Sequence, residues 1–193
     1  MRSIGVRDRV ERAALELFAA KGVDGVSIAE IAGTAGVAQG ALYRHYRSKD
    51  ELAWTLFSAA YLRTGAELDA IRAREPNFRS RIGAMVGHFC ALYDSDPALF
   101  RFMLIVQHDL LPRIGPKERT PVEAVAETVL DAIRAREIEP VGPQDAAAVI
   151  IGIVLQTAVF HTYGRLRGPL GKRAAGLANA AIAAIEAMAK RKA

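Results

Sequence analysis

Cysteine is almost absent from the chain, and so is any sign of export. Cys90 is the only cysteine among 193 residues, so no internal disulfide can form. Without a second thiol nearby, Cys90 is better interpreted as a small buried hydrophobic residue than as a redox sensor. The N-terminus, MRSIGVRDRVERAALELF, lacks the apolar stretch and small-residue cleavage site of a signal peptide. These absences favour a cytoplasmic protein.

A hydrophobic run long enough to span a bilayer is also missing. The longest one, AAAVIIGIVLQTAVF from Ala146 to Phe160, is interrupted by Gln156. It falls short of the roughly 20 residues that a transmembrane helix needs. We therefore expect a buried helix there and no membrane partner.

The sequence motifs that mark common enzyme classes are lacking as well. HExxH, CxxC and GxSxG do not occur, and GPLGKRA lacks the first glycine and the Ser or Thr of a phosphate-binding loop. The sequence therefore predicts no catalytic residues, no metal ligands and no cofactor. An enzyme stays open as the alternative from a different class.

What the chain does contain is a set of clear helix signals, and no strand signal competes with them. Val10, Ala13, Ala14, Leu17 and Phe18 follow the spacing of an amphipathic helix, with Gly22 as its predicted C-terminal cap. Helix starts are predicted by the capping sequences SIAE at 27–30 and SKDE at 48–51, and by Asp96-Pro97 and Thr120-Pro121. Further helices are expected near residues 79–93, 143–163 and 171–190. The sequence therefore predicts an all-α chain of about nine helices.

Two of the predicted helices have the spacing of a helix-turn-helix. Residues 28–34 and about 39–45 are separated by Ala35-Gly36-Val37-Ala38, in which Gly36 can adopt positive φ. One side of the pair is apolar and is expected to face the first helix: Ile31, Ala32, Val37, Leu42 and Tyr46. The other side carries Gln39, Gly40, Tyr43, Arg44 and His45, which suits a helix in the DNA major groove. A net charge of +5 also favours a polyanionic partner. A helical hairpin with a solvated face is the alternative.

The run VSIAEIAGTAGVAQGALYRHYRSKDEL, within about Val10 to Leu56, resembles the TetR family of bacterial transcriptional regulators. The resemblance implies that Ser27 and Ala29 lie near the DNA backbone or groove edge. It implies base contacts by Gln39, Gly40, Ala41 and Arg44, and phosphate contacts by Tyr43, His45 and Lys49. The sequence departs from the family at Ala38, where a serine or similar cap is common. That alanine forgoes about 1 kcal/mol of helix capping.

The resemblance further implies two domains, a helix-turn-helix domain at 1–50 (the motif at about 27–46) and a helical ligand-binding and dimerisation domain at 51–193. A homodimer of this kind, most simply a repressor, would release a pseudo-palindromic operator when a small molecule enters the C-terminal domain. A ligand-binding helical protein without DNA binding is the alternative. The sequence does not identify the effector.

Two features of the C-terminal part are predicted from its residues. Apolar and amide side chains could line an effector cavity, together with two histidines, His88 and His108, that would need partners if buried. The residues predicted to line it are Trp54, Met85, His88, Phe89, Leu92, Met103, Gln107 and Gln156. Ordinary core packing explains each of them equally well. The helices near 143–163 and 171–190 alternate small and large apolar residues, which predicts a four-helix interface between two copies. An internal bundle is the alternative there.

Overall fold

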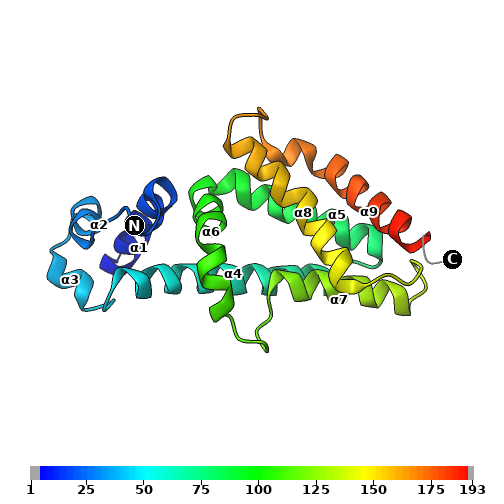
Figure 1. The fold of residues 1–193 in the computed structure, drawn as a ribbon, viewed down its shortest axis with the longest axis horizontal. Helices are drawn as coiled ribbons and strands as arrows, with labels where there is room; N and C mark the ends of the chain where they lie inside the picture. Colours follow the sequence, from blue (N-terminus) through cyan, green and yellow to red (C-terminus); the bar gives the residue numbers. More distant parts are fainter. Residues whose placement is uncertain (1–4, 191–193) are drawn as a thin grey trace. The chain divides into compact units, whose positions relative to one another are not determined.

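The computed structural model describes residues 5–190, which form nine α-helices and two short 3₁₀ segments (Figure 1). The prediction of an all-α chain of about nine helices is confirmed. The helices are α1 (Val6–Lys21), α2 (Ile28–Ala35), α3 (Gln39–Tyr43), α4 (Lys49–Arg74), α5 (Phe78–Ser95), α6 (Pro97–Leu110), α7 (Pro121–Arg134), α8 (Pro143–Thr162) and α9 (Ala174–Lys190), with η1 (Leu111–Arg113) and η2 (Leu170–Arg173).

The predicted helix starts are confirmed by side-chain caps. Each capping oxygen accepts a backbone N–H of the first turn, which otherwise has no partner within the helix. The pairs are Ser27 Oγ with Glu30 N at 3.1 Å, Ser48 Oγ with Glu51 N at 3.1 Å, Asp96 Oδ1 with Leu99 N at 3.0 Å, and Thr120 Oγ1 with Val122 N at 3.2 Å.

Two helix boundaries differ from the sequence prediction. The third helix ends at Tyr43 rather than near His45, because the amides of His45 and Tyr46 both bond to the carbonyl of Leu42 in a tight turn. The last helix begins at Ala174 rather than Gly171, since residues 170–173 form the 3₁₀ segment η2. Asp94 holds that segment by accepting the amides of Leu170 and Gly171, both at 2.8 Å.

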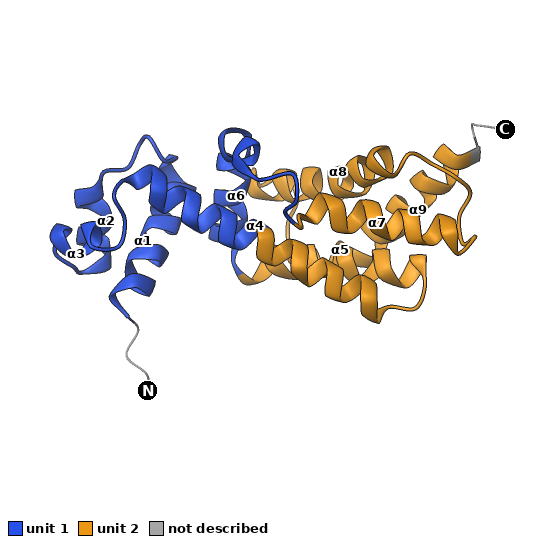
Figure 2. Ribbon diagram, turned by 90° about the horizontal axis from the view of Figure 1, so that it is seen from below, with its two compact units in different colours: residues 1–61, 96–118 blue, residues 62–95, 119–193 orange. Residues whose placement is uncertain are grey.

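The chain divides into two compact units, shown in different colours in Figure 2. Unit 1 contains residues up to 61 together with 96–118, that is, α1, α2, α3, the first half of α4, and α6. Its core includes Val10, Phe18 and Phe102, and the rings of the two phenylalanines stack with centroids 5.9 Å apart. The predicted domain boundary at residue 50 stays a prediction.

Unit 2 contains residues 62–95 and those from 119 onward. Here α5 packs against α7, α8 and α9, α7 packs against α8, and α8 packs against α9. The buried side chains are mostly aliphatic, among them Ile82, Val129 and Ile185. Cys90 is buried in this core, as expected, and burial raises the pKa of its thiol to about 11. The thiol therefore stays protonated at neutral pH.

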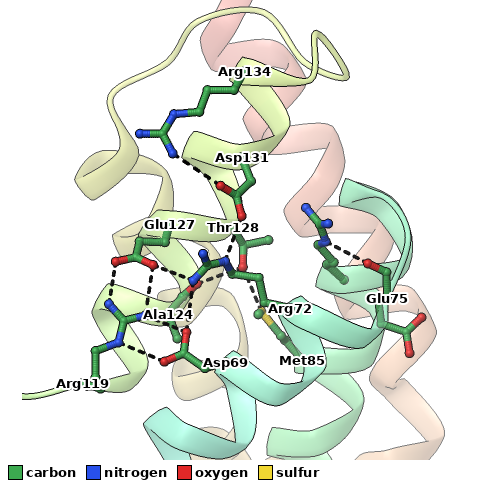
Figure 3. Close-up of polar contacts among 11 residues, drawn as sticks. Asp69, Arg72, Glu75, Met85, Arg119, Ala124, Glu127, Thr128, Asp131 and Arg134 are labelled. Carbon is green, nitrogen blue, oxygen red and sulfur yellow. Dashed lines mark hydrogen bonds and ion pairs between the residues drawn. The ribbon is translucent and has the colours of Figure 1, made fainter.

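An ionic network in unit 2 joins the second half of α4 to α7 (Figure 3). Arg72 contacts Glu127 at 2.5 Å and Asp131 at 2.8 Å, while Arg119 contacts Asp69 at 2.7 Å and Glu127 at 2.5 Å. These side chains are partly exposed, so water weakens each pair.

The helix at 146–160 was expected to be buried, but only one of its faces is buried. One face of α8 packs inside unit 2 through Ala146, Ala147, Ile150, Val154 and Ala158. The rest of the helix is more accessible, with Phe160 49% exposed and Tyr163, just after its end, 75% exposed. Within residues 5–190, α8 is the one helix long and apolar enough for a membrane span, which is weak evidence by itself. The expectation was wrong because an apolar run can serve an external surface as well as a core.

Candidate nucleic-acid interface

A tight turn joins α2 to α3. Gly36 follows α2 in the left-handed conformation, with φ 64° and ψ 41°, and the amide of Val37 bonds back to the carbonyl of Ala32 at 3.0 Å. Glycine is suited to this position because a side chain disfavours that backbone geometry. The predicted role of Gly36 is confirmed. Ala38 starts α3 without a side-chain cap.

One face of the helix pair is anchored to α1. Ile31, Ala32, Leu42 and Tyr46 are buried, as predicted, whereas Val37 is only half-buried. The hydroxyl of Tyr46 donates to Glu11 Oε1 at 2.5 Å, and Glu11 also pairs with Arg7 at 2.7 Å. Burial, followed by the hydrogen bond to Glu11, raises the pKa of Tyr46 to about 12. Glu11 was not predicted as a partner of Tyr46, since its spacing from Arg7 indicates only a surface pair.

The opposite face is open to solvent and carries most of the predicted DNA-binding residues. Ala41 is half-buried, and the exposed members of the set are Ser27, Ala29, Gln39, Gly40, Tyr43, Arg44 and His45. Gln39 and Arg44 lie at the two ends of α3 and can donate hydrogen bonds to base edges. The hydroxyl oxygen of Ser27 accepts the amide of Glu30 as the cap of α2, which leaves its O–H free to donate.

Lys49 is placed differently from the other basic residues. Its Nζ points at the loop between α1 and α2, where it lies 3.0 Å from the carbonyl oxygen of Val23, 3.2 Å from that of Asp24 and 3.4 Å from that of Val26. Its side chain is 30% exposed. The predicted phosphate contact by Lys49 would compete with these three hydrogen bonds.

The residues predicted to line an effector cavity are distributed over both units. In unit 1, Trp54, Met103 and Gln107 are half-buried. In unit 2, Met85 is buried, and His88, Phe89 and Leu92 are half-buried. His88 Nε2 lies 3.1 Å from Glu67 Oε2, a contact that is close enough for an ion pair but not aligned as a hydrogen bond.

Gln156 and His108 are exposed. Neither is therefore a buried polar group that needs a ligand as its partner, because both lie on solvent-facing sides of their helices. The cavity itself stays a prediction.

A pocket of about 250 Å³ does occur within unit 1. It is lined by Val23, Asp24, Asp50, Ala53, Val106, Asp109, Leu110 and Arg113, none of which belongs to the predicted set. Next to it, the guanidinium of Arg113 lies 4.2 Å from the ring centroid of Trp54. Among residues 5–190, no group of three or more His, Cys, Asp or Glu is arranged to hold a metal ion.

Comparison with known sequences supports the N-terminal assignment. Residues 12–54 match the family model described as bacterial regulatory proteins, tetR family. The chain is 43% identical over 61 residues to MftR of Mycobacterium tuberculosis, named as a candidate transcriptional regulator of mycofactocin biosynthesis. That match covers 32% of this chain and 31% of MftR.

The likeness to solved structures extends over nearly the whole chain. The fatty acid degradation regulator FadR from Bacillus halodurans has a similar fold, with a TM-score of 0.81 at 15% identity over 94% of this chain and 96% of its own. The transcriptional regulator FadR from Bacillus subtilis, solved in complex with stearoyl-CoA, gives a TM-score of 0.75 at 15% identity over 92% and 98% of the two chains. With the helix-turn-helix geometry, the match at residues 12–54 shows that the N-terminal part of this chain is a helix-turn-helix domain of the tetR family of bacterial regulatory proteins.

Proposed function

We propose that the chain controls transcription by inserting α3 into the major groove of a specific operator. The observation that carries this proposal is the division of α3 into two sides. Leu42 is fully buried, while Gln39, Tyr43 and Arg44 are exposed. Gln39, Gly40, Ala41 and Arg44 then face base edges. Tyr43, His45 and the start of α2 at Ser27 and Ala29 approach the backbone.

The operator is proposed to be pseudo-palindromic and bound by a homodimer. A single recognition helix reads only a few base pairs, so two copies related by a two-fold axis are needed for a specific site. The accessible face of α8, with Phe160 49% exposed, and the exposed alanines of α9 support an interface built from these two helices. Half-sites should lie about one helical turn apart.

The effector is proposed to be a small apolar molecule with one or two polar groups, whose binding releases the operator. The stearoyl-CoA bound by the FadR of similar fold makes long acyl chains the first apolar group to test, with the acyl-CoA thioester as a probe whose head group is much more polar. Linkage requires that the effector and the operator weaken each other equally, and about 1 to 3 kcal/mol of coupling would be ordinary. Such a regulator acts where the DNA is, in the cytoplasm.

The test begins with selection of bound duplexes from a random library, followed by titration of the best site. We expect one sequence to be enriched as an inverted repeat and to bind at least about a thousandfold more tightly than random DNA. Stearoyl-CoA should then lower the affinity for that operator about fivefold or more. No enrichment would contradict DNA recognition and favour a ligand-binding protein alone. Enrichment without an acyl-CoA effect would contradict only the effector class.

A further inference from the structure

The three backbone carbonyls around Lys49 use all of its hydrogen-bonding capacity. An ammonium group has three N–H donors and no acceptor. The carbonyl oxygens of Val23, Asp24 and Val26 lie at 3.0, 3.2 and 3.4 Å from Nζ, so each donor has one partner. The carboxylate of Asp24 is 3.9 Å away but fully exposed, and water weakens its pairing with the ammonium.

The loop that presents these carbonyls has little freedom to turn them elsewhere. Gly22 has φ of 74°, which a side chain would disfavour. A Cβ on Gly25 would lie only 2.5 Å from the carbonyl oxygen of Lys21, so the backbone passes close to the end of α1. Val26 is buried. The carbonyls of Val23 and Val26 are partly buried, and Lys49 gives both a charged hydrogen-bond donor.

Lys49 joins the parts of the chain that bracket α3. It is the first residue of α4, and the loop it holds lies between the end of α1 and Ser27, the cap of α2. Between α2 and α4, α3 is five residues long and has no side-chain cap. A helix so short does not hold its own position, and its orientation therefore depends on how the flanking helices are fixed.

We propose that Lys49 is a positioning residue of the DNA-binding unit rather than a phosphate ligand. Its ammonium fastens the start of α4 to the α1–α2 loop and so orients α3 for the groove. The proposal rests on the DNA-binding function proposed above. It departs from the role that the family resemblance implies for this residue.

Lys49→Arg and Lys49→Met distinguish a positioning residue from a phosphate ligand. Arginine can replace lysine as a phosphate ligand but not as the positioning residue. The planar guanidinium fork of arginine binds phosphate well but does not match a compact ring of three carbonyls. If Lys49 is a positioning residue, Lys49→Arg and Lys49→Met should both lower operator affinity by about tenfold. The slope of log K against log salt should stay at the wild-type value in both. If Lys49 binds phosphate, Lys49→Arg should keep full affinity, and Lys49→Met should flatten the slope by about one unit per subunit.

Hydrogen exchange in the DNA-free protein provides a second measurement. Amides of residues 22–27 and the first turn of α2 should exchange at least about tenfold faster in both Lys49 variants. Lys117→Met is the matched control, because Lys117 is an exposed lysine of the same unit that lies outside the α1–α2 loop and α2. Its exchange in the loop should stay unchanged.

Either wild-type affinity of Lys49→Arg or unchanged loop exchange in both variants would overturn the proposal. Failure of the wild-type protein to bind any duplex would instead contradict the proposed function. The exchange measurement does not depend on DNA, so it would still decide whether Lys49 holds the loop.

Discussion

Gln39 and Arg44 are the side chains on which sequence recognition is expected to depend. Each can form a bidentate contact with a base edge, so Gln39→Ala or Arg44→Ala should cost about 1 to 3 kcal/mol on the true operator and little on random DNA. Fluorescence anisotropy with both duplexes measures the ratio. Arg63→Ala is the control, since Arg63 is an exposed arginine of α4 outside the helix-turn-helix. Equal losses on operator and random DNA would show that neither side chain reads a base.

Tyr46 gives a prediction that depends on pH. Its folded-state pKa of about 12 lies above the ordinary value of 10, so folding favours the protonated hydroxyl. Its contribution to stability is therefore complete below about pH 10 and is lost as the pH rises toward 12. Urea unfolding of the wild type and Tyr46→Phe should show a stability difference that shrinks across this range. A difference that is constant with pH would contradict the raised pKa of Tyr46.

The exposure and contacts of single residues were predicted well from the sequence where local spacing determines them. They were predicted poorly where tertiary contacts determine them. The exposed side of α3 follows from helical spacing, because Leu42 and Tyr46 must face the core. By contrast, Lys49 looks like its basic neighbours in the sequence. Its contact with three carbonyls depends on a loop 23 to 26 residues earlier in the chain, and no local pattern signals that.

At the level of elements, the packing of α4 against the segment before α7 depends on Gly65. A Cβ there would lie 2.2 Å from the carbonyl oxygen of Arg119. Gly65→Ala should therefore destabilise the protein by about 1 to 3 kcal/mol in urea unfolding, despite the better helix propensity of alanine. Gly83→Ala in α5 is the control, because nothing lies within 4 Å of its added Cβ, and it should be neutral or stabilising. Equal effects of the two substitutions would contradict the close approach.

Helix starts were predictable because their caps are local, as at Ser27 and Thr120. The end of α3 was not, since two amides compete for the carbonyl of Leu42 and the outcome depends on how Tyr46 is held. The partners in the ionic network of Figure 3 could not be predicted from the sequence either. Asp69 and Arg119 are 50 positions apart, so only the folded chain brings them together.

For the whole molecule, the accessible face of α8 predicts self-association. Phe160→Glu should convert the proposed dimer to a monomer, because a charge would be buried against an apolar partner surface. Sedimentation velocity at micromolar concentration measures this, and operator affinity should fall with it. Ile105→Glu is the control, a similar substitution at a 41% exposed residue of α6. A monomeric wild-type protein at these concentrations would remove the basis for a palindromic operator.

The sequence predicted α8 as apolar but could not say how much of it faces outward, because the pattern of a core helix and that of an interface helix are alike. The effector site was the least predictable part for a related reason. Apolar residues at the predicted positions can either pack or line a cavity, and only their arrangement distinguishes the two.

The contact between Arg113 and Trp54 gives the protein an intrinsic fluorescence probe. Trp54 is the single tryptophan of the chain, so ultraviolet emission from indole reports on one place, where the guanidinium that follows α6 lies over a ring of α4. Any displacement of the end of α6 from α4 should alter the wavelength or yield of that emission without an attached dye. Stopped-flow mixing with a test compound could then time the movement inside unit 1. The emission spectrum of Arg113→Ala would then serve as the reference for a Trp54 ring without the guanidinium contact.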